Sequence, residues 1–478
     1  MLSRNEIQQI LEASLAQGAD FAEVFLEDTV NTSLSYLDGK LDKVQLGRDY
    51  GLGLRLIKGL ETAYGYSSDL SLEHLQRLVK DTAAVLQGAQ KGQDTGSEPA
   101  RSQAKAAGPS GTVHLGTEAK KRGFMPILVD FKEKSLHDKV RLMQEAYDTA
   151  RTYDALIQQA SVSYLETDQR VLIANSEGLW VEDRRPRGRF HVGAIAGEGD
   201  RKESGGISKG AGQGWEFFQA LDVRAMATEA AEQALTMMRA DYAPKGVMPV
   251  ILDNGFGGVL FHESCGHGLE GYFTSKHISV FSDKLGEQIA SPVVTAIDDG
   301  TICGEWGTAA YDDEGTPTQR NVLIENGILK SYLVDRMSGK RLGLPSTGSC
   351  RRQSYRFAPV SRMNNTFIAP GDSTREEMIA ATDHGLYAKK LGGGSVDVTT
   401  GNFNFAVTEA YLIENGKITK PVRGATLIGQ GCEVLKKIDM VGRELALAPG
   451  MCGAGSGLVP VNVGQPPIRI TEMTVGGR

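Results

Sequence analysis

Cysteine is scarce in this sequence, with 5 among 478 residues, and none occurs before Cys265. An odd number of cysteines scattered along a chain does not make the paired framework of a disulfide-rich secreted protein. We therefore expect a fold without disulfides in a reducing compartment, the cytoplasm. The positions are Cys265, Cys303, Cys350, Cys432 and Cys452.

Long apolar runs are also missing. No window approaches the roughly 18 consecutive apolar residues that indicate a membrane-spanning helix. Residues 1–7 are typical of the charged start of a helix and lack the apolar core of a secretory signal. The sequence therefore predicts no association with a membrane.

Positive charge is not in excess either, because the formal net charge is −7. Proteins that hold a nucleic-acid backbone present a basic surface to it. This balance disfavours DNA or RNA as a partner.

The length and the patterning of the chain predict several domains. A chain of 478 residues exceeds what a single hydrophobic core usually organises. Residues 1–90 and residues 112–243 each combine helical spacing with strand-like alternation, so each is predicted to be an α+β domain. Residues 91–111 are polar and rich in Gly, Ala, Ser and Gln, which predicts a flexible linker or loop.

Residues 244–478 show a different pattern. Short alternating strands are separated by Asn-Gly and Gly-Gly turns, which predicts a β-rich C-terminal domain. One helix is expected inside it, near residues 255–268, and this helix carries the chemistry. The predicted fold class is α+β, with a mixed helix and strand N-terminal half and a β-rich catalytic C-terminal domain whose metal-site helix packs on a sheet.

The helix near residues 255–268 contains the string H-E-S-C-G-H, with His262, Glu263 and His267. It resembles the H-E-x-x-H zinc motif but has one more residue between the histidines. In a regular helix, side chains four residues apart lie about 40° apart around the axis, whereas five residues separate them by about 140°. Gly266 and Gly268 flank His267, so a local unwinding or bulge could bring the two imidazoles together.

A catalytic zinc site usually has three protein ligands, so the two histidines need a third. Cys265 is more consistent with packing, because its direction in the helix differs from that of His262. Cys452 lies in a glycine-rich turn with little apolar sequence around it, which suits a thiolate ligand. The candidates for the third ligand are Cys265, His277, His384, Cys432 and Cys452.

Glu263 would act as the general base for water.

Several strings together resemble the TldD branch of the TldD/PmbA peptidase family. They are H-E-S-C-G-H-G-L-E-G at 262–271, Met-Cys-Gly at 451–453, V-P-V-x-x-G-Q-P from Val459, and R-I-T-E-M-T-V-G-G from Arg469. The resemblance spans essentially the whole chain. The joint occurrence of the His-Glu-x-x-x-His string and the C-terminal Met-Cys-Gly is highly specific.

This resemblance implies a zinc-dependent peptidase with one Zn²⁺ per chain. It implies His262, His267 and Cys452 as metal ligands and Glu263 as the catalytic base. Members of the family resemble enzymes that cleave short or unfolded peptides, and some remove leader peptides from modified peptide precursors. The resemblance also implies a PmbA/TldE-type subunit as a heterodimer partner, with a homodimer as the alternative.

Three further segments have both a functional and a structural interpretation. Residues 392–397 and 400–405 could pair with an extended substrate, or form an ordinary hairpin. A basic cluster near residue 350 could bind a carboxylate or an oxyanion, although a solvated loop is favoured. Tyr311 and Asp312 could line the pocket. The basic cluster comprises Arg351, Arg352, Tyr355 and Arg356.

Two alternative functions are also consistent with this sequence. One is a non-catalytic regulator that binds a protein partner, of the DNA gyrase modulator type, which would have no need of Glu263 between two histidines. The other is a metal-dependent hydrolase whose substrate is not a peptide, which would use the same residues.

Overall fold

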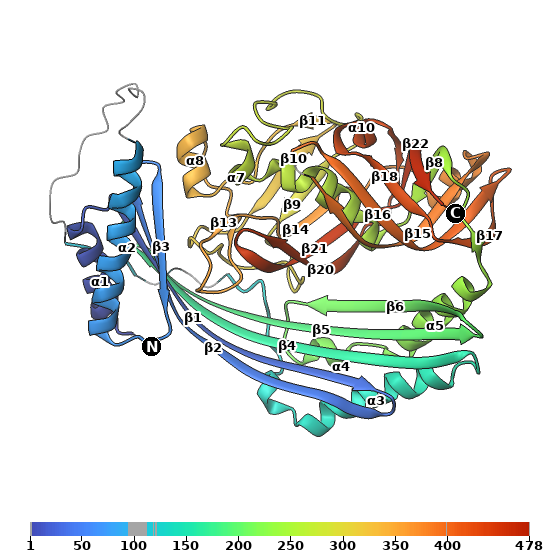
Figure 1. Cartoon of the computed structure of the whole chain (residues 1–478), viewed down its shortest axis with the longest axis horizontal. Helices are drawn as coiled ribbons and strands as arrows, with labels where there is room; N and C mark the ends of the chain where they lie inside the picture. Colours follow the sequence, from blue (N-terminus) through green and yellow to red (C-terminus); the bar gives the residue numbers. More distant parts are fainter. Residues whose placement is uncertain (1, 94–111, 118, 120–121, 398, 478) are drawn as a thin grey trace.

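The computed structural model describes residues 2–93, 112–117, 119, 122–397 and 399–477 (Figure 1). Of the predicted linker at 91–111, residues 94–111 lie outside this description, whereas residues 91–93 form the end of helix α2 (Leu72–Gln93). The division into domains stays a prediction, and the elements are described below by the sheets that they form.

The first half of the chain forms one antiparallel sheet of six strands in the order β3-β2-β1-β4-β5-β6. Four of its strands have 17 to 19 residues, a length of about 60 Å at roughly 3.3 Å per residue. The pairing of β1 with β4 joins strands from the two predicted N-terminal domains into this sheet. The strands are β1 (Phe21–Leu37), β2 (Lys40–Lys58), β3 (Glu61–Ser67), β4 (Ile157–Asn175), β5 (Trp180–Glu198) and β6 (Arg201–Ala211).

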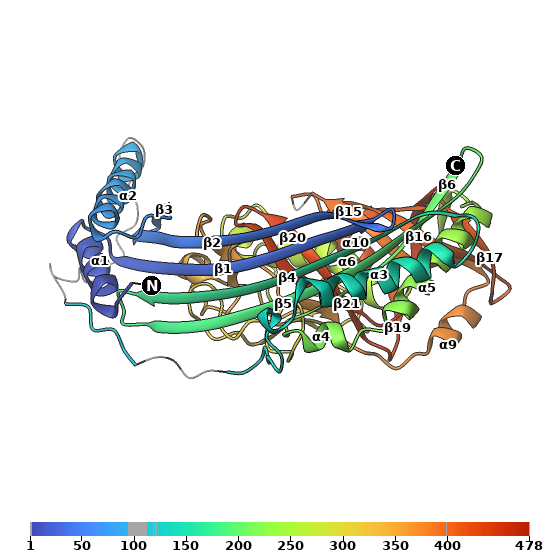
Figure 2. The same cartoon turned by 90° about the horizontal axis from the view of Figure 1, so that it is seen from below.

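Helices cover one face of this sheet and the C-terminal body lies against the other (Figures 1 and 2). In β1, Val24 and Leu26 pack with α1 (Arg4–Ala16) and α2, and Leu34 packs with α3 (Leu136–Thr152) and α5 (Val223–Arg239). The intervening Phe25 contacts Tyr311 and Tyr355 of the C-terminal body. This division follows from the period of two in a strand, which sends alternate side chains to opposite faces.

The C-terminal body contains two main sheets. The first has the order β11-β10-β9-β14-β21-β20. In the second, β15 pairs with both β8 and β16, so the pairings β8–β22–β18–β16–β15 close into a ring. The strands of the first sheet are β9 (Ala296–Asp299), β10 (Arg320–Glu325), β11 (Ile328–Leu329), β14 (Asn365–Ile368), β20 (Ala446–Ala454) and β21 (Gly457–Gln465). The strands of the second sheet are β7 (Asp241–Tyr242), β8 (Gly246–Leu252), β15 (His384–Val396), β16 (Asn402–Glu414), β17 (Lys417–Arg423), β18 (Thr426–Gln430), β19 (Ile438–Val441) and β22 (Ile468–Gly476).

Short elements connect these sheets. They are η1 (Phe131–Glu133), α4 (Glu216–Gln219), η2 (Gly255–Gly258), α7 (Gly271–Thr274), α8 (Arg336–Leu342), the pair β12 (Cys350–Arg351) and β13 (Val360–Ser361), α9 (Arg375–Ala380) and α10 (Gly431–Lys436). Within the described residues, no helix is both long enough and apolar enough to cross a membrane.

A central helical segment lies in the core between the two sheets. It begins at α6 (Val259–Phe261), and its apolar residues Val259, Leu260 and Phe261 are buried together with Val463 of the first sheet and Leu427 of the second. The predicted fold class, an α+β protein with a β-rich C-terminal half and the motif helix packed on a sheet, is confirmed.

Buried ion pairs join the N-terminal sheet to the C-terminal body. Arg55 of β2 lies 2.9 Å from Glu23 of β1 and 2.5 Å from Glu314 of the body. Arg352 lies 2.8 Å from Glu23, and the backbone N–H of Arg352 donates to Asp313. The favoured prediction of a solvated loop at Arg351 and Arg352 is wrong, because both side chains are buried at this junction.

The other members of that basic cluster differ. Tyr355 is also buried, against Phe25. Arg356 alone is exposed, and it pairs with Asp49 at 2.6 Å. Sequence reasoning could not separate these side chains, because the loop becomes buried only when the sheet packs on it.

We predict that Arg55→Met lowers the free energy of unfolding by about 3–5 kcal/mol, because it leaves Glu23 and Glu314 buried with less compensating charge. Arg48, on the same strand, is the matched control, since its pair with Asp28 is exposed on the arginine side. Arg48→Met is expected to change stability by less than about 1 kcal/mol. Urea denaturation of both variants measures this difference, and equal effects would contradict the role of the buried pair.

Candidate metal centre

The two histidines of the motif are brought together by a π-helical turn. The segment His262–Gly266 is π-helical, and the backbone N–H of His267 donates to the carbonyl of His262. This i→i+5 hydrogen bond widens the turn, so that residues five apart lie on one side of the helix. The two imidazole centroids are 4.9 Å apart, with their planes at 82°. The distortion that the spacing required is thus a single π-turn.

The glycines beside His267 serve close packing. A Cβ atom on Gly266 would lie 2.3 Å from Sδ of Met363, and one on Gly268 would lie 2.6 Å from the ring of Phe281. Gly266 has ordinary right-handed helical dihedral angles, φ −52° and ψ −51°. The predicted local bulge is present as the π-turn, and the glycines beside it have a steric role: only a residue without a side chain lets the turn approach its neighbours so closely.

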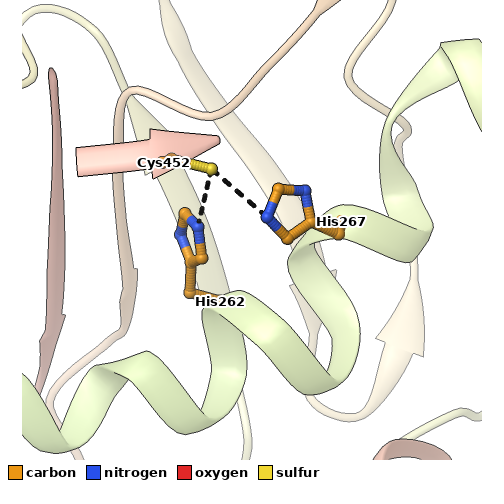
Figure 3. Close-up of side chains that lie close together, drawn as sticks. All are labelled: His262, His267 and Cys452. Atoms are coloured by element: carbon orange, nitrogen blue, oxygen red, sulfur yellow. Dashed lines mark hydrogen bonds between the residues drawn. The ribbon is translucent and has the colours of Figure 1, made fainter. Parts of the chain in front are cut away.

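Cys452, on strand β20, completes the cluster from a distant part of the chain (Figure 3). Its Sγ lies 3.2 Å from Nε2 of His262 and 3.2 Å from Nε2 of His267. The possible ligand atoms of the three residues all lie within 4.8 Å of one another, and all three residues are buried. The expectation that Cys452 has little apolar surface around it is wrong, because Val459 and Val461 of β21 pack against it.

The electrostatics of the cluster favour a thiolate. Burial by itself opposes ionisation of the Cys452 thiol, but the charges and hydrogen bonds of His262 and His267 outweigh it and lower its pKa to about 3. Burial likewise opposes protonation of His267, yet Glu270 and Cys452 raise the pKa of this imidazole well above its usual value. The cluster therefore holds negative charge on sulfur, which is the form that binds metal ions.

Glu270 orients one of the imidazoles. Its Oε1 lies 3.1 Å from Nδ1 of His267. A carboxylate oxygen accepts this hydrogen bond, so Nδ1 carries a hydrogen and Nε2 points toward the cluster, where it would offer its lone pair to a metal ion once its own proton is lost. Carboxylates commonly hold metal-binding histidines in this way.

Arg362 fixes the strand that carries the thiol. Its fully buried guanidinium donates to the carbonyl of Cys452, and to Oγ of Ser456 and the carbonyl of Gly457, both at 2.9 Å. Sequence reasoning assigned no role to Glu270 or Arg362. Glu270 could have been found from its position three residues after His267, whereas nothing in the sequence marks Arg362.

Glu263 lies at the border between the cluster and solvent. Its Oε2 is 3.9 Å from Nε2 of His267, and its side chain is 22% exposed. The carboxylate therefore combines proximity to the cluster with access to water.

Three of the other candidate ligands, Cys265, His277 and His384, are not at the cluster. Cys265 lies in the hydrophobic core, as expected for packing. His277 and His384 are exposed, with Asp283 and Asp383 as their respective neighbours. The side chain of Cys432 lies outside the described residues.

The remaining predicted segments also lie elsewhere. Gly394 pairs with Phe405 across the antiparallel strands β15 and β16, which is the hairpin alternative. Tyr311 and Asp312 line a cavity between the N-terminal sheet and the body, together with Arg351 and Arg352.

The donor set fits a zinc ion. Two imidazole nitrogens and a thiolate are ligands that Zn²⁺ prefers, and three protein ligands leave a position open for water or substrate. No fourth His, Cys, Asp or Glu in the described part of the chain joins the group of possible ligands.

Comparison with known proteins identifies relatives along the whole chain. Models of the PmbA/TldA metallopeptidase family match its domain 1 at residues 22–86, its central domain at 129–238 and its C-terminal domain at 245–477. A metalloprotease TldD homolog of Haemophilus influenzae is 39% identical over 100% of this chain and 97% of its own length. A zinc metalloprotease TldD homolog of Saccharolobus solfataricus is 30% identical, over 55% of this chain and 58% of its own length.

Solved structures share the fold. TldE from Thermococcus kodakarensis has a TM-score of 0.76 at 19% identity, covering 99% of this chain and 100% of that one. A Thermotoga maritima protein described as a candidate modulator of a DNA gyrase has a TM-score of 0.78 at 20% identity, covering 99% of both chains.

We predict that the metal-free protein keeps a thiolate at Cys452 from about pH 8 down to about pH 4, because the pKa is lowered and the proton returns only near pH 3. The ultraviolet absorbance of the thiolate measures this, as the difference between wild type and Cys452→Ser. Cys350→Ser is the control and should leave the signal unchanged, since burial raises the pKa of Cys350. A difference that titrates near pH 8.5, the ordinary cysteine value, would contradict the assignment.

Proposed function

The chain belongs to the PmbA/TldD metallopeptidase family, and on that basis we propose that it is a zinc-dependent peptidase. His262, His267 and Cys452 would bind one Zn²⁺ per chain, and Glu263 would be the catalytic base. The observation that carries the proposal is the convergence of these three buried ligands within 4.8 Å. The zinc metalloprotease among the relatives supports the choice of metal.

Zinc at such a site supplies Lewis-acid chemistry, polarising the carbonyl of a scissile peptide bond and making water more acidic. Glu263 accepts the proton of the attacking water on its carboxylate and can then deliver it to the leaving amine. Its partial exposure allows water to reach it. Glu270 keeps the Nε2 lone pair of His267 directed toward the cluster.

We propose short or unfolded peptides as substrates, including leader peptides of modified precursors. Burial of all three ligands supports this, because the surface of a folded protein would not reach them. A PmbA/TldE-type subunit is the proposed heterodimer partner, supported by the shared fold with TldE, and a homodimer is the alternative. The free thiols of Cys265, Cys303, Cys350 and Cys452 support a cytoplasmic location.

Metal analysis of the purified protein is the first test. Wild type should contain about one zinc per chain, and His262→Ala and Cys452→Ala should lose it, because each removes one of three ligands. His277→Ala and His384→Ala are matched controls, since both histidines are exposed and away from the cluster. A wild-type protein that takes up no zinc even after its addition would refute the metal site.

A second test separates catalysis from binding. Glu263→Gln should keep the zinc but reduce peptide cleavage by about 10²–10⁴-fold, the usual contribution of a general base. Glu287→Gln, at an exposed carboxylate, is the control and should cleave normally. If Glu263→Gln keeps every activity of the wild type, the non-catalytic gyrase-modulator alternative becomes the better explanation.

A further inference from the structure

The junction between the N-terminal sheet and the C-terminal body encloses a cavity of about 280 Å³, which we call the junction cavity. Its lining includes Arg187 of β5 and Arg351 of β12, and also Met451 and Leu458 of the β20–β21 hairpin. None of the proposed metal ligands is among its lining residues. Cys452 follows Met451 on β20, so the strand directs the two side chains to opposite faces.

Two buried arginines of this cavity form no direct ion pair with any carboxylate in the described part of the chain. Arg187 is 5% exposed and donates only to the carbonyls of Trp306 at 3.0 Å and Thr308 at 2.9 Å. Arg351 is 6% exposed and donates only to the carbonyl of Met363, at 2.6 Å. Within the described residues, neither guanidinium forms an ion pair.

The other arginines of the same junction are different. Arg185 lies 2.6 Å from Asp313, and Arg352 lies 2.8 Å from Glu23. Burial lowers the pKa of Arg187 to about 9, and the charges of Arg351 and Arg185 add to this. Burial is also the main cause that lowers the pKa of Arg351, to about 10. The charges of Asp183 and Asp313 act on Arg187, and those of Asp313 and Asp298 on Arg351, in the direction that raises the pKa. Both guanidiniums therefore stay cationic at neutral pH, yet neither forms a direct ion pair with a carboxylate of the described residues.

The carboxylates of the cavity are already engaged. Asp313 binds Arg185 and the backbone N–H of Arg352. Asp49 pairs with Arg356. Asp312 and Glu27 accept backbone N–H groups, from Cys350 and Tyr355 respectively, and burial raises the pKa of each. An anion from outside would give Arg187 and Arg351 the direct ion pair that these carboxylates do not form with them.

Arg187 and Arg351 both line the cavity, and each has N–H groups beyond those that donate to the carbonyls named above. The Nε atoms of Arg55 and Arg352 are fully buried without a hydrogen-bond partner. The nitrogen atoms of Arg187 and Arg351, which line the cavity, do not belong to this group. The cavity reaches solvent along the hairpin, where Met451 is 44% and Leu458 is 51% exposed. A guanidinium pair behind an apolar rim matches a carboxylate attached to an apolar group.

We propose that the junction cavity binds the C-terminal carboxylate of a short apolar peptide, held by Arg187 and Arg351. Its volume, at the lower end of ligand pockets, suits one or two residues. The choice of a peptide rests on the proposed function, since hydrolysis releases new C-terminal carboxylates. Inorganic phosphate could satisfy the same charges, and the experiment separates the two.

The test is calorimetric binding of the dipeptide Ala-Leu and of its C-terminal amide to the zinc-loaded Glu263→Gln protein, which should leave the peptide intact. The free acid should bind about 10- to 100-fold more tightly than the amide, the range expected for charged hydrogen bonds. Arg351→Gln and Arg187→Gln should each remove most of this preference. Arg356→Gln, an exposed arginine of the same loop, should retain it.

A second background separates this proposal from the metal site. The preference should persist when His262→Ala is added, because the cavity does not include the zinc ligands. If the preference for the free acid is lost in that background, the carboxylate binds to the metal and not to the arginines, and the proposal is overturned. An equal affinity for acid and amide in the unsubstituted cavity would overturn it without depending on the folding of any arginine variant.

The last measurement tests whether inorganic phosphate binds in the junction cavity. Phosphate that binds in an Arg351-dependent manner, without any acid preference for Ala-Leu, would replace the peptide assignment by a phosphate site. Competition between phosphate and Ala-Leu, with the acid preference intact, would support the shared guanidinium pair.

Discussion

The thiolate of Cys452 between two imidazoles is the interaction on which the proposed chemistry depends. It joins strand β20 to a helical segment 190 residues away in sequence, at 3.2 Å from each ring. A buried thiolate needs compensating positive charge. The histidines supply this charge in the metal-free protein, and a bound metal ion would supply it in their place. The π-turn, the Glu270 hydrogen bond and the Arg362 contacts all hold this arrangement in place.

The buried arginines at the junction of the sheet and the body fall into two groups. Arg55, Arg185 and Arg352 are each paired with carboxylates, which makes the junction a buried network that joins distant segments. Arg187 and Arg351 instead line a cavity and form no direct ion pair among the described residues. Because a buried charge is unfavourable without compensation, the contrast distinguishes cations that hold the structure together from cations available to a ligand.

The fold class followed from patterning, because strands with alternating burial and helices with one apolar face leave different periods in a sequence. The joining of strands from two predicted domains into one sheet did not follow, since strand pairing depends on contacts between residues far apart, as between Glu27 and Val171. The loop at Arg351 and Arg352 was misjudged for the same reason. A charged loop resembles a solvated one until its distant carboxylate partners are known.

The sequence by itself determined the family resemblance, the candidate residues His262, Glu263, His267 and Cys452, and the need for a distortion between the histidines. These depend on residue identity and local spacing. Only the tertiary structure decided that the distortion is a π-turn, that Val459 and Val461 bury Cys452, and that Glu270 and Arg362 support the cluster. Only the fold brings Arg187 and Arg351 to one cavity. The physical reason is that hydrogen bonds, burial and charge compensation act between atoms close in space, whatever their separation along the chain.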